Sequence, residues 1–506
     1  MNTECEKNIF PRLFAQAAIW LLIAFGIGFA AWTVFFTETG NGDNVEHIHA
    51  TWLIAYGEVP YRDFFQHHNP LLWYLFAPVI RLFGGNALQI LDAAHAMALS
   101  AGFAFLFVVY KICTRFFASR YAALLSLLVL CPPYYYIYCF NYNPDTFMAL
   151  SLAVGLYFLF TYWENKRLPA LVLSFVSFFV AFLFTQKILT VLAPLGLIFL
   201  LANRREKDCI SDMWYALLIP VVGLLFFIAL LYYGNVLDIY WQSNFVFNVK
   251  MQAYYGDRKI DVIDYPVFFL SGGLALLSIA TQWQKQGIIY RTIALLFVLE
   301  LFQRCFYFAI APYYMLPFMA FAACLNSVLI ERAMHKHFWT VWVLLIVAAA
   351  YAAISEPRYL SARTTDRSFA RYVSANVTPC DYVISSFLSN QSIISKDPHY
   401  YWSLLGHVDI AGEETGIALK PDLNKLVMQY KPKLVSSGIY WNNYYLNRGR
   451  NVPVQQISPE IIGRYYLPTP FQGLYLLKYE YQGKNCIYDK NRPRSENKLR
   501  SPSTGC

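Results

Sequence analysis

The sequence predicts a polytopic α-helical membrane protein that carries a soluble domain at its carboxyl end. Of the 506 residues, 58% are hydrophobic and only 14% are charged, whereas roughly 25% are charged in a typical soluble domain. Apolar runs near the bilayer-crossing length of about 20 residues recur up to position 354. Polar residues become frequent only after that point. We therefore expect a transmembrane domain over 1–354 and a soluble α/β domain over 355–506.

The apolar runs give about eleven expected spans. They lie at 13–36, 86–110, 119–138, 145–163, 169–186, 188–202, 213–234, 264–281, 288–303, 306–330 and 338–354. The first run is longer than a typical signal-peptide core, and no clear small-residue cleavage site follows it. We therefore expect it to remain as a membrane anchor.

Basic residues in alternate loops predict the orientation, because Lys and Arg accumulate on the cytoplasmic side of short loops. The base-bearing loops contain Lys111, Arg115, Arg120, Lys166, Arg167, Arg204, Arg205, Lys207, Lys285, Arg332 and Lys336. The segments 42–74 and 235–262 and the carboxyl domain are then expected on the outer side. The net charge of +9 comes largely from these loops and a basic tail, so it does not support nucleic-acid binding.

The carboxyl domain is expected to contain a helix and several strands. Residues 421–430 place Leu423, Val427 and Tyr430 on one helical face. The segments 382–386, 433–437 and 474–477 have the β-branched and aromatic composition of strands. Because an oxidising outer compartment permits disulfides, we also expect a bridge between Cys380 and Cys486.

The segment 42–74 reads GDNVEHIHATWLIAYGEVPYRDFFQHHNPLLWY and places acids and histidines between two apolar segments. Asp43 and Glu46 are three residues apart and would share a helical face. Another outer acid, Asp145, follows Asn143 at the start of the fourth span. A transporter would more naturally place such groups near the middle of its spans. The segment is therefore predicted to be part of an active site.

The order of these motifs resembles the GT-C class of membrane glycosyltransferases, especially the protein O-mannosyltransferases and the bacterial aminoarabinose transferases. Asp43, Gly57 and the segment 68–74 follow the family's order of acidic motif, glycine-bearing helix and basic-Pro-Pro-Leu motif. Lys187 after the fifth span and Arg304 before an aromatic, proline-bearing span extend the likeness. Two departures are His68, where the family usually has Lys, and Asn44, where a second acid is common.

The resemblance implies a GT-C-like fold with interfacial helices in the first outer loop and a reaction with inversion at the sugar carbon. Asp43 would be the general base that takes the acceptor's proton; the alternative is a solvated loop acid or helix cap. Asp145 and Glu46 would assist catalysis, although Asp145 also fits a helix-start signal. His67 and Asn143 would contact the acceptor or the sugar.

Arg304, Lys187 and His68 would bind the donor phosphate, whose negative charge grows as it leaves. The alternatives are a helical ion pair of Arg304 with Glu300 and snorkelling of Lys187 to the headgroups. No cofactor is expected, because the sequence has no phosphate-binding glycine loop or zinc-type cysteine spacing. The alternative is a divalent metal on His67, His68 and the nearby acids, but adjacent histidines more often bond locally.

The expected function is transfer of a hexose or pentose from a polyprenyl-phosphate carrier to a lipopolysaccharide, another surface glycan or a protein. The expected location is a bacterial inner membrane, with the site on the periplasmic side. The tripeptides at 376–378 and 390–392 fit N-glycosylation, so an endoplasmic reticulum enzyme using dolichyl phosphate stays open. A flippase of lipid-linked sugars and a noncatalytic glycan-assembly protein are the alternatives from other classes.

Overall fold

The structure of the chain is a computed structural model. It describes residues 28, 42–130, 140–250, 266–306, 315–336, 365–384, 393–398, 400, 422–436, 456–471 and 473–481. Within these ranges, the side chains of residues 42–43, 128–130, 266–269, 304–306, 336 and 365–367 are not described.

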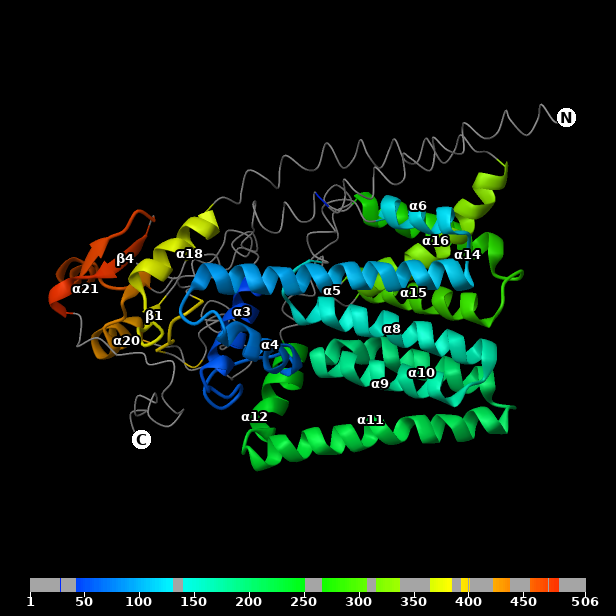
Figure 1. The fold of residues 1–506 in the computed structure, drawn as a ribbon, viewed down its shortest axis with the longest axis horizontal. Helices are drawn as coiled ribbons and strands as arrows, with labels where there is room; N and C mark the ends of the chain where they lie inside the picture. Colours follow the sequence, from blue (N-terminus) through cyan, green and yellow to red (C-terminus); the bar gives the residue numbers. More distant parts are fainter. Residues whose placement is uncertain are drawn as a thin grey trace.

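Long helices lie side by side and form most of the molecule (Figure 1). They are α5 (Ala87–Phe116), α6 (Arg120–Leu130), α8 (Pro144–Asn165), α9 (Leu168–Phe184), α10 (Leu189–Asn203), α11 (Lys207–Tyr233), α14 (Pro266–Gln282), α15 (Ile288–Phe306) and α16 (Leu316–Lys336). Within the described ranges, five helical segments are long and apolar enough to cross a membrane: Ala87–Phe116, Pro144–Asn165, Gln186–Asn203, Lys207–Tyr233 and Leu316–His335.

Each of these five segments lies on an expected span, and α6, α9, α14 and α15 lie on four more. The expected spans at 13–36 and 338–354 fall outside the described residues. The prediction of a multi-pass helical membrane protein is therefore confirmed.

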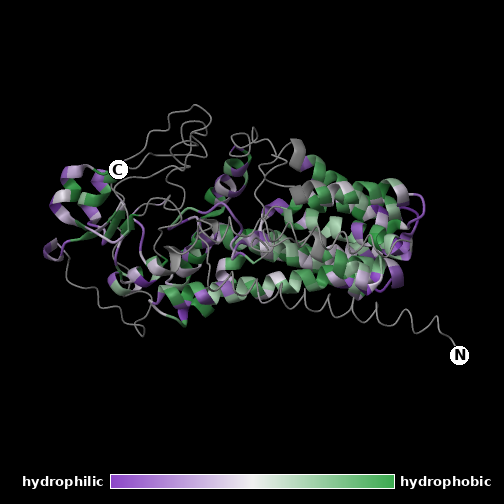
Figure 2. Ribbon diagram, turned by 90° about the horizontal axis from the view of Figure 1, so that it is seen from above, coloured by the Kyte–Doolittle hydropathy of each residue, from purple (hydrophilic) through white to green (hydrophobic). Residues whose placement is uncertain are grey.

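The surface of α11 shows what kind of solvent surrounds the helices. Trp214, Leu218 and Phe226 expose 66%, 61% and 64% of their surface. A helix that is apolar all round and not buried by protein is suited to lipid. Figure 2 shows the same hydrophobic character along most helices of the bundle, with hydrophilic residues gathered toward its ends.

The carboxyl part contains a small sheet at one end of the helical bundle (Figure 1). Its elements are α18 (Thr365–Asn376), β1 (Val383–Ile384), α20 (Leu423–Tyr430), β2 (Leu434–Ser436), α21 (Pro459–Tyr465), β3 (Tyr466–Pro468) and β4 (Leu474–Leu477). The strand order is β1-β2-β4-β3, with β1 parallel to β2 and the other pairs antiparallel. The helix and the three strands expected here are confirmed, and β3 is additional.

The expected helix α20 begins and ends at recognisable residues. The Asp422 side chain accepts a hydrogen bond from the backbone N–H of Lys425, and Lys431 ends the helix in the left-handed region at a φ of 44°. Leu423 and Val427 are buried, as the helical pattern predicts. Cys380 is disulfide-bonded; Cys486 lies outside the described residues, so their pairing stays a prediction.

The core of the carboxyl part is continuous with the core of the helical bundle. Val373, Val383 and Leu434 belong to the same buried cluster as Ala87 of α5. The backbone N–H of Ala87 also donates to the Ser374 hydroxyl at 3.0 Å. The sheet therefore packs on one end of the bundle, whereas the expected domain boundary at 354–355 lies outside the described residues.

Candidate active site

Two short helices lie between the bundle and the sheet: α3 (Gly42–Ala55) and α4 (Leu71–Arg81) (Figure 1). They lie in or directly after the segment 42–74, where interfacial helices were expected. Every residue of α3 from Asn44 to Ala55 is buried. The polar residues of this helix are therefore enclosed by protein, which requires hydrogen-bond partners for them.

Asn44 fixes the start of α3. Its side-chain oxygen accepts from the backbone N–H of Tyr142 at 2.8 Å, and its amide nitrogen donates to Nε2 of His95 at 3.1 Å. Thr51, two turns later, is hydrogen-bonded to the Tyr142 hydroxyl at 2.9 Å. The absence of a second acid after Asp43 thus has a structural reason, because an amide here joins α3 to α5 and to the residues before α8.

The backbone of the His67-His68 pair is held by three donors from other parts of the chain. The carbonyl of His67 accepts from the Gln186 amide at 3.2 Å and from the Asn248 amide at 2.8 Å. The carbonyl of His68 accepts from the Tyr61 hydroxyl at 2.5 Å. Gln186 and Asn248 were not predicted to be site residues, because nothing in the sequence pairs them with a loop so distant. Tyr61 was not predicted either, although it lies only seven residues before His68.

Asn69 continues this anchoring toward α4. Its amide donates to the backbone carbonyl of Phe182 in α9, and its side-chain oxygen accepts from the Tyr240 hydroxyl at 2.7 Å. Tyr240 lies on the short helix α12 (Leu237–Trp241). Residues 67–70 (HHNP), called the HHNP loop below, are therefore fixed between α9 and α12. The two histidines thus project from a preorganised loop.

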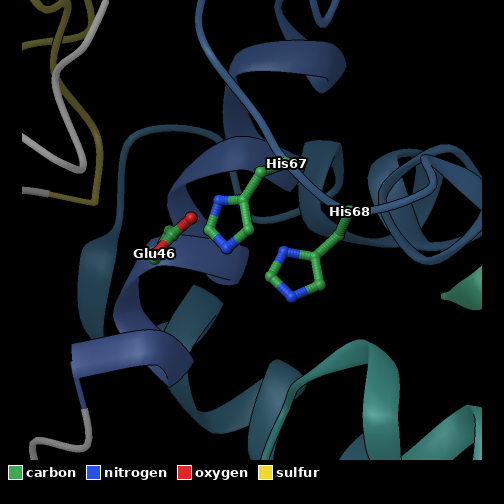
Figure 3. Close-up of side chains that lie close together, drawn as sticks. All are labelled: Glu46, His67 and His68. Atoms are coloured by element: carbon green, nitrogen blue, oxygen red, sulfur yellow. The ribbon is translucent and has the colours of Figure 1, made fainter. Parts of the chain in front are cut away.

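The side chains of Glu46, His67 and His68 meet in front of this loop (Figure 3). The ring centroids of His67 and His68 are 4.1 Å apart, and each of the three residues offers an oxygen or nitrogen within 4.8 Å of the others. Glu46 is 3% exposed and His68 is 7% exposed. The sequence placed these residues near one another, and the structure brings them into one cluster.

Burial keeps the neighbouring rings neutral. Burial, with a smaller contribution from the charge of Lys187, lowers the pKa of His47 to about 3. Burial is also the main cause that lowers the pKa of His68, followed by the effects of His67, Lys187 and His47. At neutral pH, the His68 ring therefore has a hydrogen-bonding nitrogen to offer but no positive charge for a phosphate.

Lys187 supplies a positive charge near His47 and His68. Its ammonium lies 3.3 Å from Oδ2 of Asp145. Lys187 follows α9 on the 3-10 turn η1 (Gln186–Ile188), and its side chain is 31% exposed, whereas that of Asp145 is 2% exposed. The pair thus joins a buried carboxylate to a cation that solvent or a ligand can reach.

The start of α8 positions Asp145. Asn143 caps the helix by accepting from the N–H of Thr146 at 3.0 Å, and Pro144 occupies the first turn. The buried side-chain nitrogen of Asn143 has no hydrogen-bond partner among the described residues. Capping therefore explains the side-chain oxygen of Asn143. The sugar contact predicted for Asn143 would use its side-chain nitrogen.

Asp43 and Arg304 are placed only by their backbones. Asp43 lies in the first turn of α3 and Arg304 near the end of α15. Their side chains fall outside the described residues, so the base role of Asp43 and the donor role of Arg304 stay predictions. Of the other cations in segments expected on the outer side, Arg62 forms a surface ion pair with Asp63 at 2.8 Å.

A short segment of the carboxyl part, residues 393–400, lies against this loop and α3. His49 of α3 contacts Oδ2 of Asp397 through Nε2 at 2.6 Å and donates from Nδ1 to the carbonyl of Ile393 at 2.9 Å. The backbone N–H of Phe65 donates to the carbonyl of Tyr400 at 2.8 Å. The sequence did not predict this contact between the first outer loop and the carboxyl part.

Two proton arrangements fit the His49–Asp397 contact. Because Nδ1 must donate to a carbonyl, Nε2 either belongs to an imidazolium that donates to the carboxylate or accepts from a protonated Asp397. Burial raises the pKa of Asp397, and His49 partly opposes this effect. In either form the contact is a charge-assisted or strong hydrogen bond at a buried position.

Replacing Asp397 by Ala should release the segment 393–400 from α3. The loss leaves the buried His49 ring without that partner, which should cost about 1–3 kcal/mol. Hydrogen–deuterium exchange of the full chain in detergent should show faster exchange at 393–398. Asp422→Ala, which removes the cap of α20, is the control and should leave that peptide unchanged. Equal exchange in Asp397→Ala and the native chain would contradict the anchoring role.

Comparison with known proteins supplies the family context. Residues 67–233 match the sequence pattern of the dolichyl-phosphate-mannose-protein mannosyltransferase family. No curated protein sequence matches the chain significantly.

Solved structures of ArnT from Cupriavidus metallidurans are similar to the chain at 15% sequence identity. The match to the apo form has a TM-score of 0.52 and covers 71% of this chain and 68% of the ArnT chain. The match to the form bound to undecaprenyl phosphate has a TM-score of 0.49 and covers 71% of this chain and 69% of the ArnT chain.

The matched segment begins at His67 and includes Asp145 and Lys187. The resemblance expected from the motifs is therefore confirmed: the chain carries the sequence pattern of the mannosyltransferase family over 67–233 and has an ArnT-like GT-C fold.

Proposed function

We propose that the chain is an inverting glycosyltransferase that moves one hexose or pentose from a polyprenyl-phosphate carrier to an acceptor at the outer face of the membrane. The observation that carries the proposal is the Lys187–Asp145 pair at the end of the bundle, beside the preorganised HHNP loop. A partly exposed cation and buried acids at a membrane boundary suit a donor whose phosphate is polar and whose tail is lipid.

The donor class is inferred from the relatives. The family matched by residues 67–233 is described by its use of dolichyl-phosphate-mannose. ArnT, whose apo form has a similar fold, has been crystallised with undecaprenyl phosphate. Both molecules are polyprenyl-type phosphates, and we extend this carrier class to the present chain.

The proposed reaction is a single displacement. An acceptor oxygen or nitrogen attacks the anomeric carbon on the side opposite the phosphate, and its proton passes to the Asp43 carboxylate. The bond between the anomeric carbon and the phosphate oxygen breaks, and its electron pair leaves on the polyprenyl phosphate. Lys187 and Arg304 are proposed to stabilise that charge.

The position of the charged pair favours this enzyme over a flippase. Asp145 lies in the first turn of α8, and Lys187 lies just before α10. Both are at helix ends, whereas alternating-access transporters place their coupling groups near the middle of the bilayer.

We further propose that the chain lies in a bacterial inner membrane with its site on the periplasmic side. The proposed acceptor is a lipopolysaccharide, another surface glycan or a protein.

Mass spectrometry of surface glycans and lipid-linked sugars in a deletion strain tests the function. Loss of one sugar from one glycan, accumulation of the charged carrier, and recovery with the native chain are the expected results. They would identify both the sugar and the acceptor. A complete glycan in the deletion strain, or movement of an unchanged lipid-linked sugar across the membrane by the purified chain, would reject the transferase.

A further inference from the structure

We propose that Glu46, His67 and His68 form a binding site for one divalent transition-metal ion of the Zn²⁺ type. The inference goes beyond the proposed function, because it concerns ion binding by these side chains and does not depend on sugar transfer. Figure 3 shows the carboxylate and the two rings facing one region of space in front of the HHNP loop.

The ligand chemistry fits such an ion. Two imidazoles and one carboxylate are the protein ligands of many catalytic zinc sites, in which the remaining position stays open. The three candidate atoms lie within 4.8 Å of one another. Zinc–ligand bonds of about 2.0–2.2 Å place neighbouring ligand atoms of a tetrahedral site roughly 3.3 Å apart. Small side-chain rotations therefore close the site without moving the backbone.

The loop that carries both histidines is already fixed. The carbonyl of His67 accepts from Gln186 and Asn248, and the carbonyl of His68 accepts from Tyr61. These bonds hold the backbone of both histidines in place. Metal sites have this organisation, because groups outside the ligand set orient the ligands.

Local hydrogen bonding accounts for both ring nitrogens of His49 but not for those of His68. Both ring nitrogens of His49 contact protein groups. By contrast, the buried Nδ1 of His68 has no hydrogen-bond partner within the described part of the chain. Leaving such a group unsatisfied in a buried place costs free energy, and an ion would satisfy it.

The ion would join α3 to the loop before α4. Glu46 lies on α3 one turn after Asp43, whereas His67 and His68 lie on the loop. Coordination would therefore fix the helix that carries the proposed base against the motif that precedes α4. It makes Glu46 an ion ligand in place of an acid that assists catalysis, and His68 an ion ligand in place of a phosphate contact.

Metal analysis of the full chain in detergent tests the site directly. After chelation and reloading with Zn²⁺ alone, the native chain should retain about one equivalent through gel filtration. Glu46→Gln, His67→Gln and His68→Gln should each lower the affinity by roughly 100-fold or more. His335→Gln is the matched control, because His335 is a surface residue with a 77% exposed side chain, and it should bind as the native chain does.

A stability measurement separates lost coordination from lost folding. Zn²⁺ should raise the Tm of the native chain and of His335→Gln, because an ion that binds only the folded state stabilises it. It should not raise the Tm of Glu46→Gln, which keeps the size of the side chain. If the variants fail to fold, Co²⁺ added to the native chain should give the visible spectrum of a nitrogen- and oxygen-liganded tetrahedral ion.

The proposal is overturned if the native chain retains no more Zn²⁺ than its three variants do, or if Co²⁺ gives only the spectrum of the hydrated ion. Neither result bears on sugar transfer, which the glycan analysis measures. Conversely, a chain that binds Zn²⁺ but restores no glycan would keep the ion site and reject the transferase.

Discussion

Replacing Lys187 by Met should lower the rate of sugar transfer by about 10²–10³-fold, because the leaving phosphate loses a cation that stabilises its charge. The ammonium also lies 3.3 Å from the carboxylate of Asp145, which is 2% exposed. Removing it leaves a buried charge without that partner, so the chain should also lose about 1–3 kcal/mol of stability. Initial rates with a lipid-linked sugar and thermal unfolding in detergent measure the two effects.

The double variant Asp145→Asn, Lys187→Met separates these effects. A neutral amide at 145 no longer needs the ammonium, so the double variant should regain most of the stability lost by Lys187→Met. It should not regain transfer. If the two variants lose transfer only in proportion to their loss of folded chain, Lys187 is a structural partner of Asp145 and does not bind the donor.

Replacing Asp43 by Asn should lower transfer by about 10²–10⁴-fold, which is the usual contribution of a general base. An amide has nearly the same size but cannot take the acceptor's proton at neutral pH. Because Asp43 lies in the first turn of α3, the lost interaction with the helix dipole should cost only about 0.3–1 kcal/mol. Rates measured across pH should show an acidic limb for the native chain and none for Asp43→Asn.

Asp63→Asn is the matched control for Asp43→Asn. Asp63 belongs to the same outer loop, is exposed, and forms a surface ion pair with Arg62. Surface pairs of this kind contribute about 0–1 kcal/mol, so the transfer rate should stay within about twofold of the native value. Native rates in Asp43→Asn would remove this residue from the mechanism and favour Asp145 as the base.

The sequence predicted the elements whose pattern is local. The apolar runs located α5, α8, α10, α11 and α16, because a bilayer requires about 20 consecutive apolar residues. Strands β2 and β4 were visible in their composition. Strand β3 was not, because Tyr466–Pro468 has three residues, ends in proline and follows α21 directly. So short a segment becomes a strand only by pairing with β4.

The site was predictable in its residues but not in its supports. Asp145, Lys187 and the two histidines stand out as ionisable groups near apolar segments. The donors that hold the His67 carbonyl come from Gln186 and Asn248, 119 and 181 positions away. Polar side chains this distant carry no periodic signal. The role of Asn44 was hidden for the same reason, since its partners are His95 and Tyr142.

The contact between His49 and Asp397 spans 348 positions of the chain. A ribosome that has made every residue of α3 and of the HHNP loop has therefore not yet made the segment that covers them. Until translation passes Tyr400, the apolar end of α5 and the ring of His49 lack their final neighbours, because such long-range contacts form only after both partners exist. Helix α3 and the HHNP loop are synthesised early but are covered by residues 393–400 only late in translation. During this period of biogenesis they are accessible to chaperones and proteases.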